Sequence, residues 1–148
     1  MAALSANLNR LNMTRPQSET FSYVVKSGVT VYQGSLVGIE ASTGYVIPWA
    51  ATTGTTNYFL GVAQAKVVGD GTLTVQVITS VILQNVAVTG LSTIADVGKK
   101  VYGANDQDLT NSAPAAGGII GWVKAFRTAT QFDVEIYSPA EYRVQAPI

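Results

Sequence analysis

The sequence predicts an all-β protein: a compact β-barrel or β-sandwich of short antiparallel strands, with one short helical turn and an extended N-terminal arm. Three observations predict this fold class. Valine (19) and threonine (16), which fit a pleated surface better than a helix, make up almost a quarter of the chain. Several segments alternate apolar and polar residues with a period of two. Turn sequences separate these segments at short intervals, which is typical of sandwiches and barrels.

The chain begins with a polar arm, residues 1–19, followed by a single β domain at 20–148. Pro16 interrupts extended pairing just before the first expected strand. The sequence leaves two interpretations open: a frayed terminus, or an arm that becomes ordered on a partner or on a neighbouring subunit. The second is favoured because isolated apolar side chains would otherwise lie in water. These apolar residues are Leu4, Leu8, Leu11 and Met13.

Two kinds of strand are expected along the domain. Period-two alternation predicts strands with one face toward the core at 20–26 (TFSYVVK), 29–32 (VTVY), 72–78 (TLTVQVI) and 132–137 (FDVEIY). Continuous apolar runs predict strands buried on both faces at 35–41, 58–68 and 80–88. The whole pattern indicates about nine to eleven strands.

The segment STIADVG, residues 92–98, is the one expected helical turn. Thr93 stands three residues before Asp96, as in a capping box, and Gly98 ends the turn. The C-terminal segment EYRVQAPI, residues 141–148, is expected to close the last sheet.

Composition argues against several classes of function. Nine basic residues balance nine acidic ones, and charged residues make up 12% of the chain, about half the usual share. Because binding to nucleic acid or to an anionic membrane needs clustered cations, neither partner is expected. Without cysteine or histidine, the chain offers no disulfide, thiolate or imidazole chemistry. No cofactor, metal or catalytic residue is therefore predicted, and an enzyme is the least favoured class.

The segment VGKKVYGANDQDLTNS, residues 97–112, comes nearest to a chemical site because Asp106 and Asp108 stand one residue apart. A calcium loop would need a central glycine and a final glutamate, and both are missing. An acid/base pair would need one carboxyl in an apolar pocket, and nothing in the sequence indicates burial. We interpret GANDQD as an ordinary turn between two strands. Asp70 is likewise expected at the tip of a turn in GDG, residues 69–71.

Aromatic residues gather around a Thr/Gly-rich loop at residues 50–57. They could stack on a sugar, as in a carbohydrate-binding module, although packing in a core or an interface is favoured. The loop itself is a candidate secondary contact surface. The aromatic residues are Tyr45, Trp49, Tyr58 and Phe59.

The order of the segments resembles that of a known family. The chain runs through GVTVYQGSLVGIEASTGYVIP and YFLGVAQAKV, and then through TIADVGKKVYGANDQDLT and GGIIGWVKAFRTATQFDVEIYS. Over residues 20–138 this is similar to the capsid decoration, or head cement, proteins of tailed bacteriophages. In that family a short helical turn, VG-x-x-VY, an acidic or amide turn, LT and IG-x-V precede a last alternating strand.

The resemblance implies a tulip-like β domain that binds the outside of a phage capsid lattice and stabilises it. It implies a homotrimer at three-fold positions, located in the virion, with the major capsid protein as partner. Low surface charge would then belong to buried interfaces. The alternatives are a carbohydrate-binding or other adhesion module, and a phage tail or bacterial surface-layer protein. The expected capsid-contacting residues all lie in the arm: Leu4, Leu8, Arg10, Leu11, Met13 and Arg15.

Overall fold

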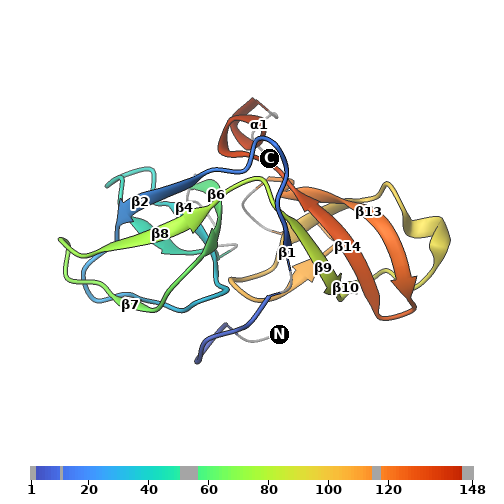
Figure 1. Ribbon diagram of the computed structural model, residues 1–148, viewed down its shortest axis with the longest axis horizontal. Coiled ribbons are helices and arrows are strands. Elements are labelled where there is room, and N and C mark those ends of the chain that lie inside the picture. The colour runs from blue at the N-terminus through green and yellow to red at the C-terminus, as the bar shows by residue number, and fades with distance from the viewer. Residues whose placement is uncertain (1–2, 11, 51–56, 115–117, 145–148) are drawn as a thin grey trace.

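A computed structural model describes residues 3–10, 12–50, 57–114 and 118–144 (Figure 1). It contains fourteen strands in the described residues, one 3-10 turn and one short α-helix. Five of the fourteen strands are only two residues long, which explains why the sequence pattern indicates fewer. The strands are β1 Asn12–Met13, β2 Thr20–Val24, β3 Thr30–Val31, β4 Leu36–Ile39, β5 Val46–Pro48, β6 Tyr58–Ala63, β7 Val67–Val68, β8 Thr74–Ile78, β9 Ile82–Val86, β10 Val88–Thr89, β11 Lys100–Gly103, β12 Leu109–Thr110, β13 Gly121–Thr128 and β14 Gln131–Ile136.

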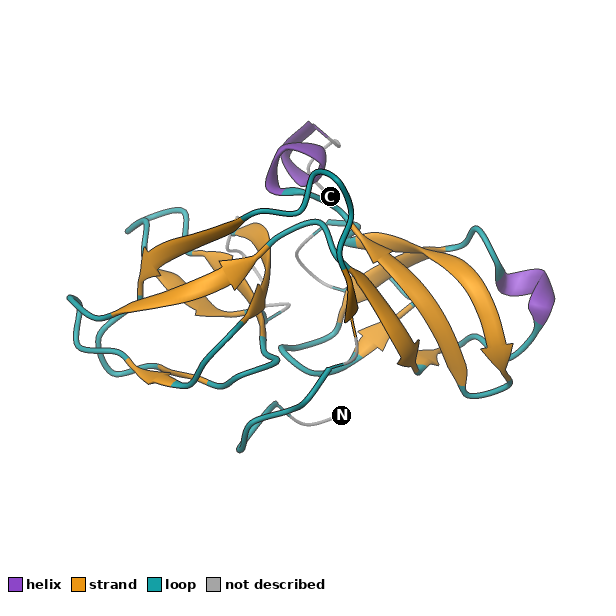
Figure 2. Cartoon of the chain, in the orientation of Figure 1, coloured by secondary structure: helices purple, strands orange, loops and turns teal. Residues whose placement is uncertain are grey.

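The strands form three sheets, which confirms the all-β prediction (Figure 2). One sheet has the order β2-β8-β6-β4-β5, and the pair β3-β7 lies beside it. The other large sheet has the order β1-β9-β14-β13-β11-β12-β10. Pairing between these strands is antiparallel except between β10 and β12. Within the described part of the chain no sheet closes into a barrel, although an isolated parallel bridge joins Val25 to Val46 at one end of the five-stranded sheet.

Two clusters of buried side chains form the core. The smaller cluster lies within the five-stranded sheet and its β3-β7 neighbour, and consists mainly of valines. The larger cluster combines residues of both large sheets: Leu36, Phe59 and Val62 come from the five-stranded sheet, whereas Val123 and Phe132 come from the seven-stranded one. The larger cluster therefore holds the two sheets together.

Trp49 lies at the centre of the larger cluster and is 2% exposed. Its ring packs edge-on against Phe59 at 5.3 Å and against Tyr142 at 5.7 Å between centroids. A Cβ atom added at Gly38 would lie 2.7 Å from this ring, and one added at Gly103 would lie 2.6 Å from its Nε1 atom. The indole therefore needs glycine on β4 and on β11, one from each sheet.

The predicted helical turn is present, and the predicted C-terminal strand is wrong for residues 141–144, whereas residues 145–148 lie outside the described part of the chain. Residues Ile94–Asp96 form the 3-10 turn, where an Asp96 carboxylate oxygen accepts hydrogen bonds from the backbone N–H groups of Ser92 and Thr93. The segment Pro139–Val144 is an α-helix, α1, and not a closing strand.

A capping box explains why α1 forms. Ser138 Oγ accepts the Glu141 N–H at 3.0 Å, and the Glu141 carboxylate accepts the Ser138 N–H at 2.8 Å. Pro139 follows the cap directly, at a position where a helix does not need an N–H donor. The helix brings Tyr142 onto Trp49, and the Tyr142 hydroxyl accepts the Gly118 N–H.

Candidate functional site: the N-terminal arm

The described part of the arm lies on the body of its own chain and passes between the two large sheets (Figure 1). Leu8 donates its backbone N–H to Gln33 O at 2.8 Å, and Gln33 donates its own to Asn7 Oδ1 at 3.1 Å. Gly34, with φ +84°, lies directly under this contact, and a Cβ atom there would collide with the Leu8 carbonyl. Position 34 therefore requires glycine for its backbone conformation and for the close approach of the arm.

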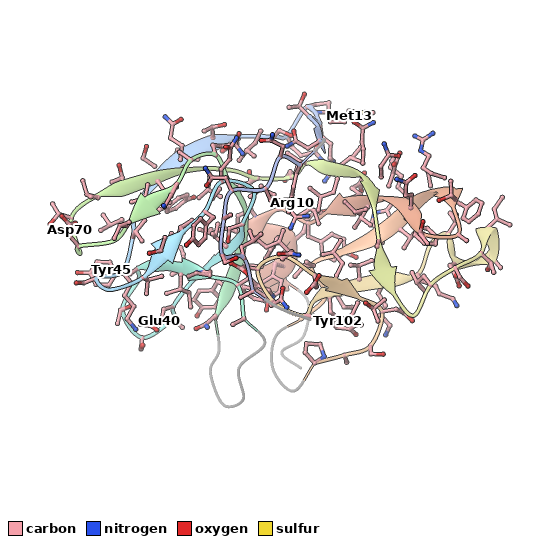
Figure 3. All side chains as sticks on the ribbon, turned by 90° about the horizontal axis from the view of Figure 1, so that it is seen from below. Arg10, Met13, Glu40, Tyr45, Asp70 and Tyr102 are labelled. Atoms are coloured by element: carbon pink, nitrogen blue, oxygen red, sulfur yellow. The ribbon has the colours of Figure 1, made fainter. Side chains whose placement is uncertain are left out.

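Arg10 binds the body of the chain through its side chain. Its guanidinium donates to Gly34 O at 2.5 Å and to Gln107 O at 2.9 Å. Burial lowers the pKa of Arg10, while the nearby negative charges of Asp106 and Asp108 act in the opposite direction. The side chain lies near the middle of the molecule (Figure 3). Because arginine stays charged under ordinary conditions, this is a cation held by carbonyl oxygens and by the field of two carboxylates.

Asp106 is buried, which corrects the interpretation of GANDQD as a simple surface turn. The residue is 3% exposed, and its carboxylate accepts the Leu4 N–H at 2.9 Å and the Ser35 hydroxyl at 3.2 Å. The carboxyl group thus joins the arm to the first residues before β4. Its partners stand 102 and 71 residues away in the chain, so the local pattern contains no sign of its burial.

The remainder of GANDQD is the predicted turn. Asn105 Oδ1 accepts the backbone N–H groups of Gln107 and Asp108, both at 2.8 Å. Asp108 accepts a hydrogen bond from the Asn105 amide. Asp70 also forms the expected turn, where its carboxylate accepts the N–H groups of Thr72 and Leu73.

The second half of the arm joins the edge of the seven-stranded sheet. In β1, Asn12 pairs with Leu83 and Met13 with Ile82 of β9. Beyond β1, the Arg15 guanidinium donates to Ile136 O at 3.2 Å and lies 3.6 Å from the Glu135 carboxylate.

The Glu135 carboxylate, next to Arg15, also interacts with Trp122 and Lys124. Burial raises its pKa, but hydrogen bonds from Trp122 and Lys124 and the charges of Arg15 and Lys124 outweigh that effect, so the net direction is downward. Trp122 Nε1 donates to Glu135 at 2.8 Å and Lys124 Nζ lies 3.2 Å from it. Glu135 therefore remains an anion that holds the end of the arm.

The structure places the six expected contact residues in different situations. Leu4, Leu8, Arg10 and Arg15 contact their own domain and are only partly exposed. Met13 is 46% exposed and lies at the periphery in Figure 3. Leu11 lies outside the described residues. The arm thus keeps its basic residues on its own body, and Met13 is the expected contact residue with the largest exposed apolar surface within its described part.

A polar depression of about 130 Å³ opens between the arm and the body. Arg10 and Asn12 line it from the arm, and Gln33, Gly34 and Gln64 line it from the body.

The aromatic residues expected around the 50–57 loop do not form an exposed platform. Trp49 and Phe59 are buried in the larger core cluster, whereas Tyr58 is partly exposed and Tyr45 is 37% exposed. Most of the loop, residues 51–56, lies outside the described residues. Packing in the core, the favoured interpretation, is confirmed for Trp49 and Phe59.

Three carboxylates outside the arm have structural partners that keep them charged. A hydrogen bond from Lys99 lowers the pKa of Asp96, helped by the backbone N–H groups of Thr93 and Ser92. Arg127 lowers the pKa of Asp133, and Lys26 lowers that of Glu40. Because these donors bind the ionised carboxylate, each of the three carboxyl groups stabilises the fold only while it is charged.

We expect the melting temperature to stay nearly constant from pH 8 to pH 5.5 and to fall below about pH 4.5. A carboxylate whose pKa is lowered in the folded state contributes stability above its ordinary pKa, here 3.8 for Asp96 and 4.5 for Glu40, and loses it as the pH falls further. No histidine is present to titrate at higher pH. Thermal melts across this range test the expectation, and Asp96→Asn should weaken the acid dependence. A clear fall in melting temperature already between pH 7 and pH 5.5 would contradict it.

Comparison with known proteins adds no family assignment. A scan against protein-family models found no match, and neither did a search of the curated proteins. Among the described residues, no group of three or more acidic side chains is placed to hold a metal ion. Neither helix described above is long and apolar enough to cross a membrane.

Proposed function

We propose that this protein is a structural component of a phage virion that binds the outer surface of the capsid lattice and stabilises it. The main support for this proposal is the way the arm is held on the body of its own chain. Its arginines bind the body of the chain, while Asn12, Met13 and Thr14 face outward at the edge of the seven-stranded sheet. A polar segment held in place at both ends presents a fixed contact surface to another protein at little cost in ordering.

The composition of the surface supports the same role. Only 12% of the residues are charged, and Asp96, Asp133 and Glu135 are bound by basic side chains of the same chain. A surface with little charge binds neutral protein surfaces without a large desolvation cost. On a lattice, many copies of a weak contact give a stable coat, and a trimer at a three-fold position would engage three subunits at once.

The burial of part of the arm changes which of its residues we propose as the capsid contact. Leu4 and Leu8 are half-buried against their own domain, so inserting them into grooves of a coat protein would require release of the arm. Met13 is exposed without any release. We therefore place Met13 and its neighbours at the contact, with the arm still bound to its own body.

Cosedimentation with empty phage shells that lack their own outer protein tests this proposal. We expect the intact protein to pellet with the shells and Met13→Lys to bind at least about tenfold more weakly, because the new charge would be buried at the contact. Val68→Lys is the matched control, since Val68 is 59% exposed on β7, away from the arm. A chain without residues 1–15 should also stay in the supernatant while keeping its β-rich circular dichroism. Equal binding by all four proteins would refute the role of the arm.

A further inference from the structure

The outer face of the seven-stranded sheet carries a row of side chains that crosses several strands. Side chains directly opposite each other on paired strands lie on the same face of a sheet, so the register identifies the members of the row. The next row along the strands, with Val123, Val134 and Leu83, lies on the other face and belongs to the larger core cluster. The outer row consists of Met13 on β1, Ile82 on β9, Glu135 on β14, Trp122 on β13 and Lys100 on β11.

Trp122 is held in a fixed position within the outer row. Its Nε1 atom donates to the Glu135 carboxylate at 2.8 Å, and Lys124 Nζ lies 5.3 Å from the centroid of its ring. The indole is nevertheless partly exposed, although most of the surface of a tryptophan is usually buried in a core or an interface. A tryptophan that is already ordered loses little side-chain freedom on binding, and such residues are typical centres of protein contacts.

Positive charge exceeds negative charge around this indole. Lys124 and Arg15 share the Glu135 carboxylate, at 3.2 and 3.6 Å respectively. Arg15 has a second acidic neighbour, Glu141, at 4.0 Å. Lys100 is exposed and forms no ion pair with the described residues of the chain. The basic side chains at this face therefore outnumber the carboxylates, although the chain as a whole has a net charge of zero.

We propose that the outer row docks an acidic segment of a partner protein, with carboxylates at Lys100 and Lys124 and an apolar side chain against Trp122. This inference rests on the proposed function, because the row begins at Met13 and extends the capsid contact across the sheet. It specifies the chemistry of the coat surface, which carries acidic side chains around an apolar one. Complementary charge of this kind orients the partner and speeds its association.

The surroundings of Trp122 favour a protein segment over a saccharide. A sugar ring stacks on an open aromatic face, whereas Lys124 already lies over this ring and Glu135 binds its N–H group. The length of the row points the same way. Because neighbouring strands lie about 4.8 Å apart, the row spans about 19 Å, which matches about six residues of extended chain.

A short acidic peptide tests this surface without a shell. The peptide has about six residues, the length that spans the row, with glutamates on both sides of a central phenylalanine. Nuclear magnetic resonance follows the indole N–H signals of the two tryptophans during the titration. The Trp122 signal should shift, and the signal of Trp49, which is 2% exposed, should not. The same peptide with lysine in place of glutamate should leave both signals unchanged.

Charge reversal identifies the side chains that bind the peptide. Lys100→Glu and Lys124→Glu should each abolish the Trp122 shift and weaken shell binding at least about tenfold at ~0.05 M salt, with a smaller difference at ~0.5 M. Because Lys100 has no ion pair to lose among the described residues, its variant should keep the fold of the unchanged protein. Lys66→Glu is the matched control. Lys66 is also exposed, and its Nζ atom lies 5.4 Å from the centroid of the Tyr32 ring, away from the outer row.

Two results would overturn the proposal. One is that the Lys100 and Lys124 variants bind the acidic peptide as the unchanged protein does. The other is that Trp122 responds to a uronic acid oligosaccharide but not to the peptide, which would assign the row to a saccharide. Because the titration needs no shell, the two proposals fail separately. A protein that binds the peptide through these lysines but does not pellet with shells would support the acidic docking surface and refute the proposed function.

Discussion

Replacing Trp49 by alanine is expected to lower the free energy of unfolding by about 3–5 kcal/mol, the range typical of removing a buried large aromatic side chain. The indole fills the space between β4 and β11 and contacts the rings of Phe59 and Tyr142. The surrounding backbone cannot easily collapse into the resulting cavity, because it belongs to both large sheets. Urea unfolding followed by far-ultraviolet circular dichroism measures this change.

Trp122→Phe is the control for loss of an indole. Trp122 is partly exposed on β13, and its Nε1 atom donates one hydrogen bond to Glu135. We expect Trp122→Phe to lower the free energy of unfolding by about 1 kcal/mol, because that hydrogen bond is lost. If Trp49→Ala cost no more than Trp122→Phe, Trp49 would not hold the two sheets together.

Replacing Gly34 by alanine is expected to displace the arm and to destabilise the protein by about 3 kcal/mol beyond the cost of the backbone conformation. The added Cβ atom would collide with the Leu8 carbonyl. Moving the arm away would break the hydrogen bonds that Leu4, Leu8 and Arg10 make with the body, each of which contributes about 1 kcal/mol. Hydrogen exchange at Leu4 and Leu8 and proteolysis within the arm should both become faster.

Gly28→Ala is the control that separates the two effects of Gly34→Ala, which are strain in the backbone at position 34 and collision with the arm. Gly28 has φ +80°, close to the +84° of Gly34, but a Cβ atom there would meet nothing within 4 Å. It should therefore cost only the strain of the left-handed conformation, about 1–2 kcal/mol, and leave the arm protected. If the two alanine variants behaved alike, the arm would not depend on its contact with Gly34.

Much of the fold follows from local sequence patterns. The alternation in TFSYV and QFDVEI predicts β2 and β14, and Thr93, Asp96 and Gly98 predict the 3-10 turn. Helix α1 also has a local signal, the Ser-Pro-Ala-Glu capping box at 138–141, which the prediction of a closing strand overlooked.

The candidate site could not be predicted to the same extent, because its contacts are long-range. Asp106 is buried only because Leu4 and Ser35 reach it from distant parts of the chain. The path of the arm depends on Gly34 and on the carbonyl oxygens that bind Arg10. Because every residue has a backbone carbonyl, a sequence pattern cannot indicate which carbonyl groups bind a side chain. An arginine within a segment of low charge was the available signal for such an interaction.

We propose that this chain binds the outside of a phage shell with its arm in place. Cryo-electron microscopy of empty shells incubated with the protein tests it most directly. We predict additional density at symmetric positions on the outer surface, with Met13 facing the coat protein and Arg10 still bound to Gly34. Shells without additional density, or a bound protein whose arm faces solvent, would contradict the account.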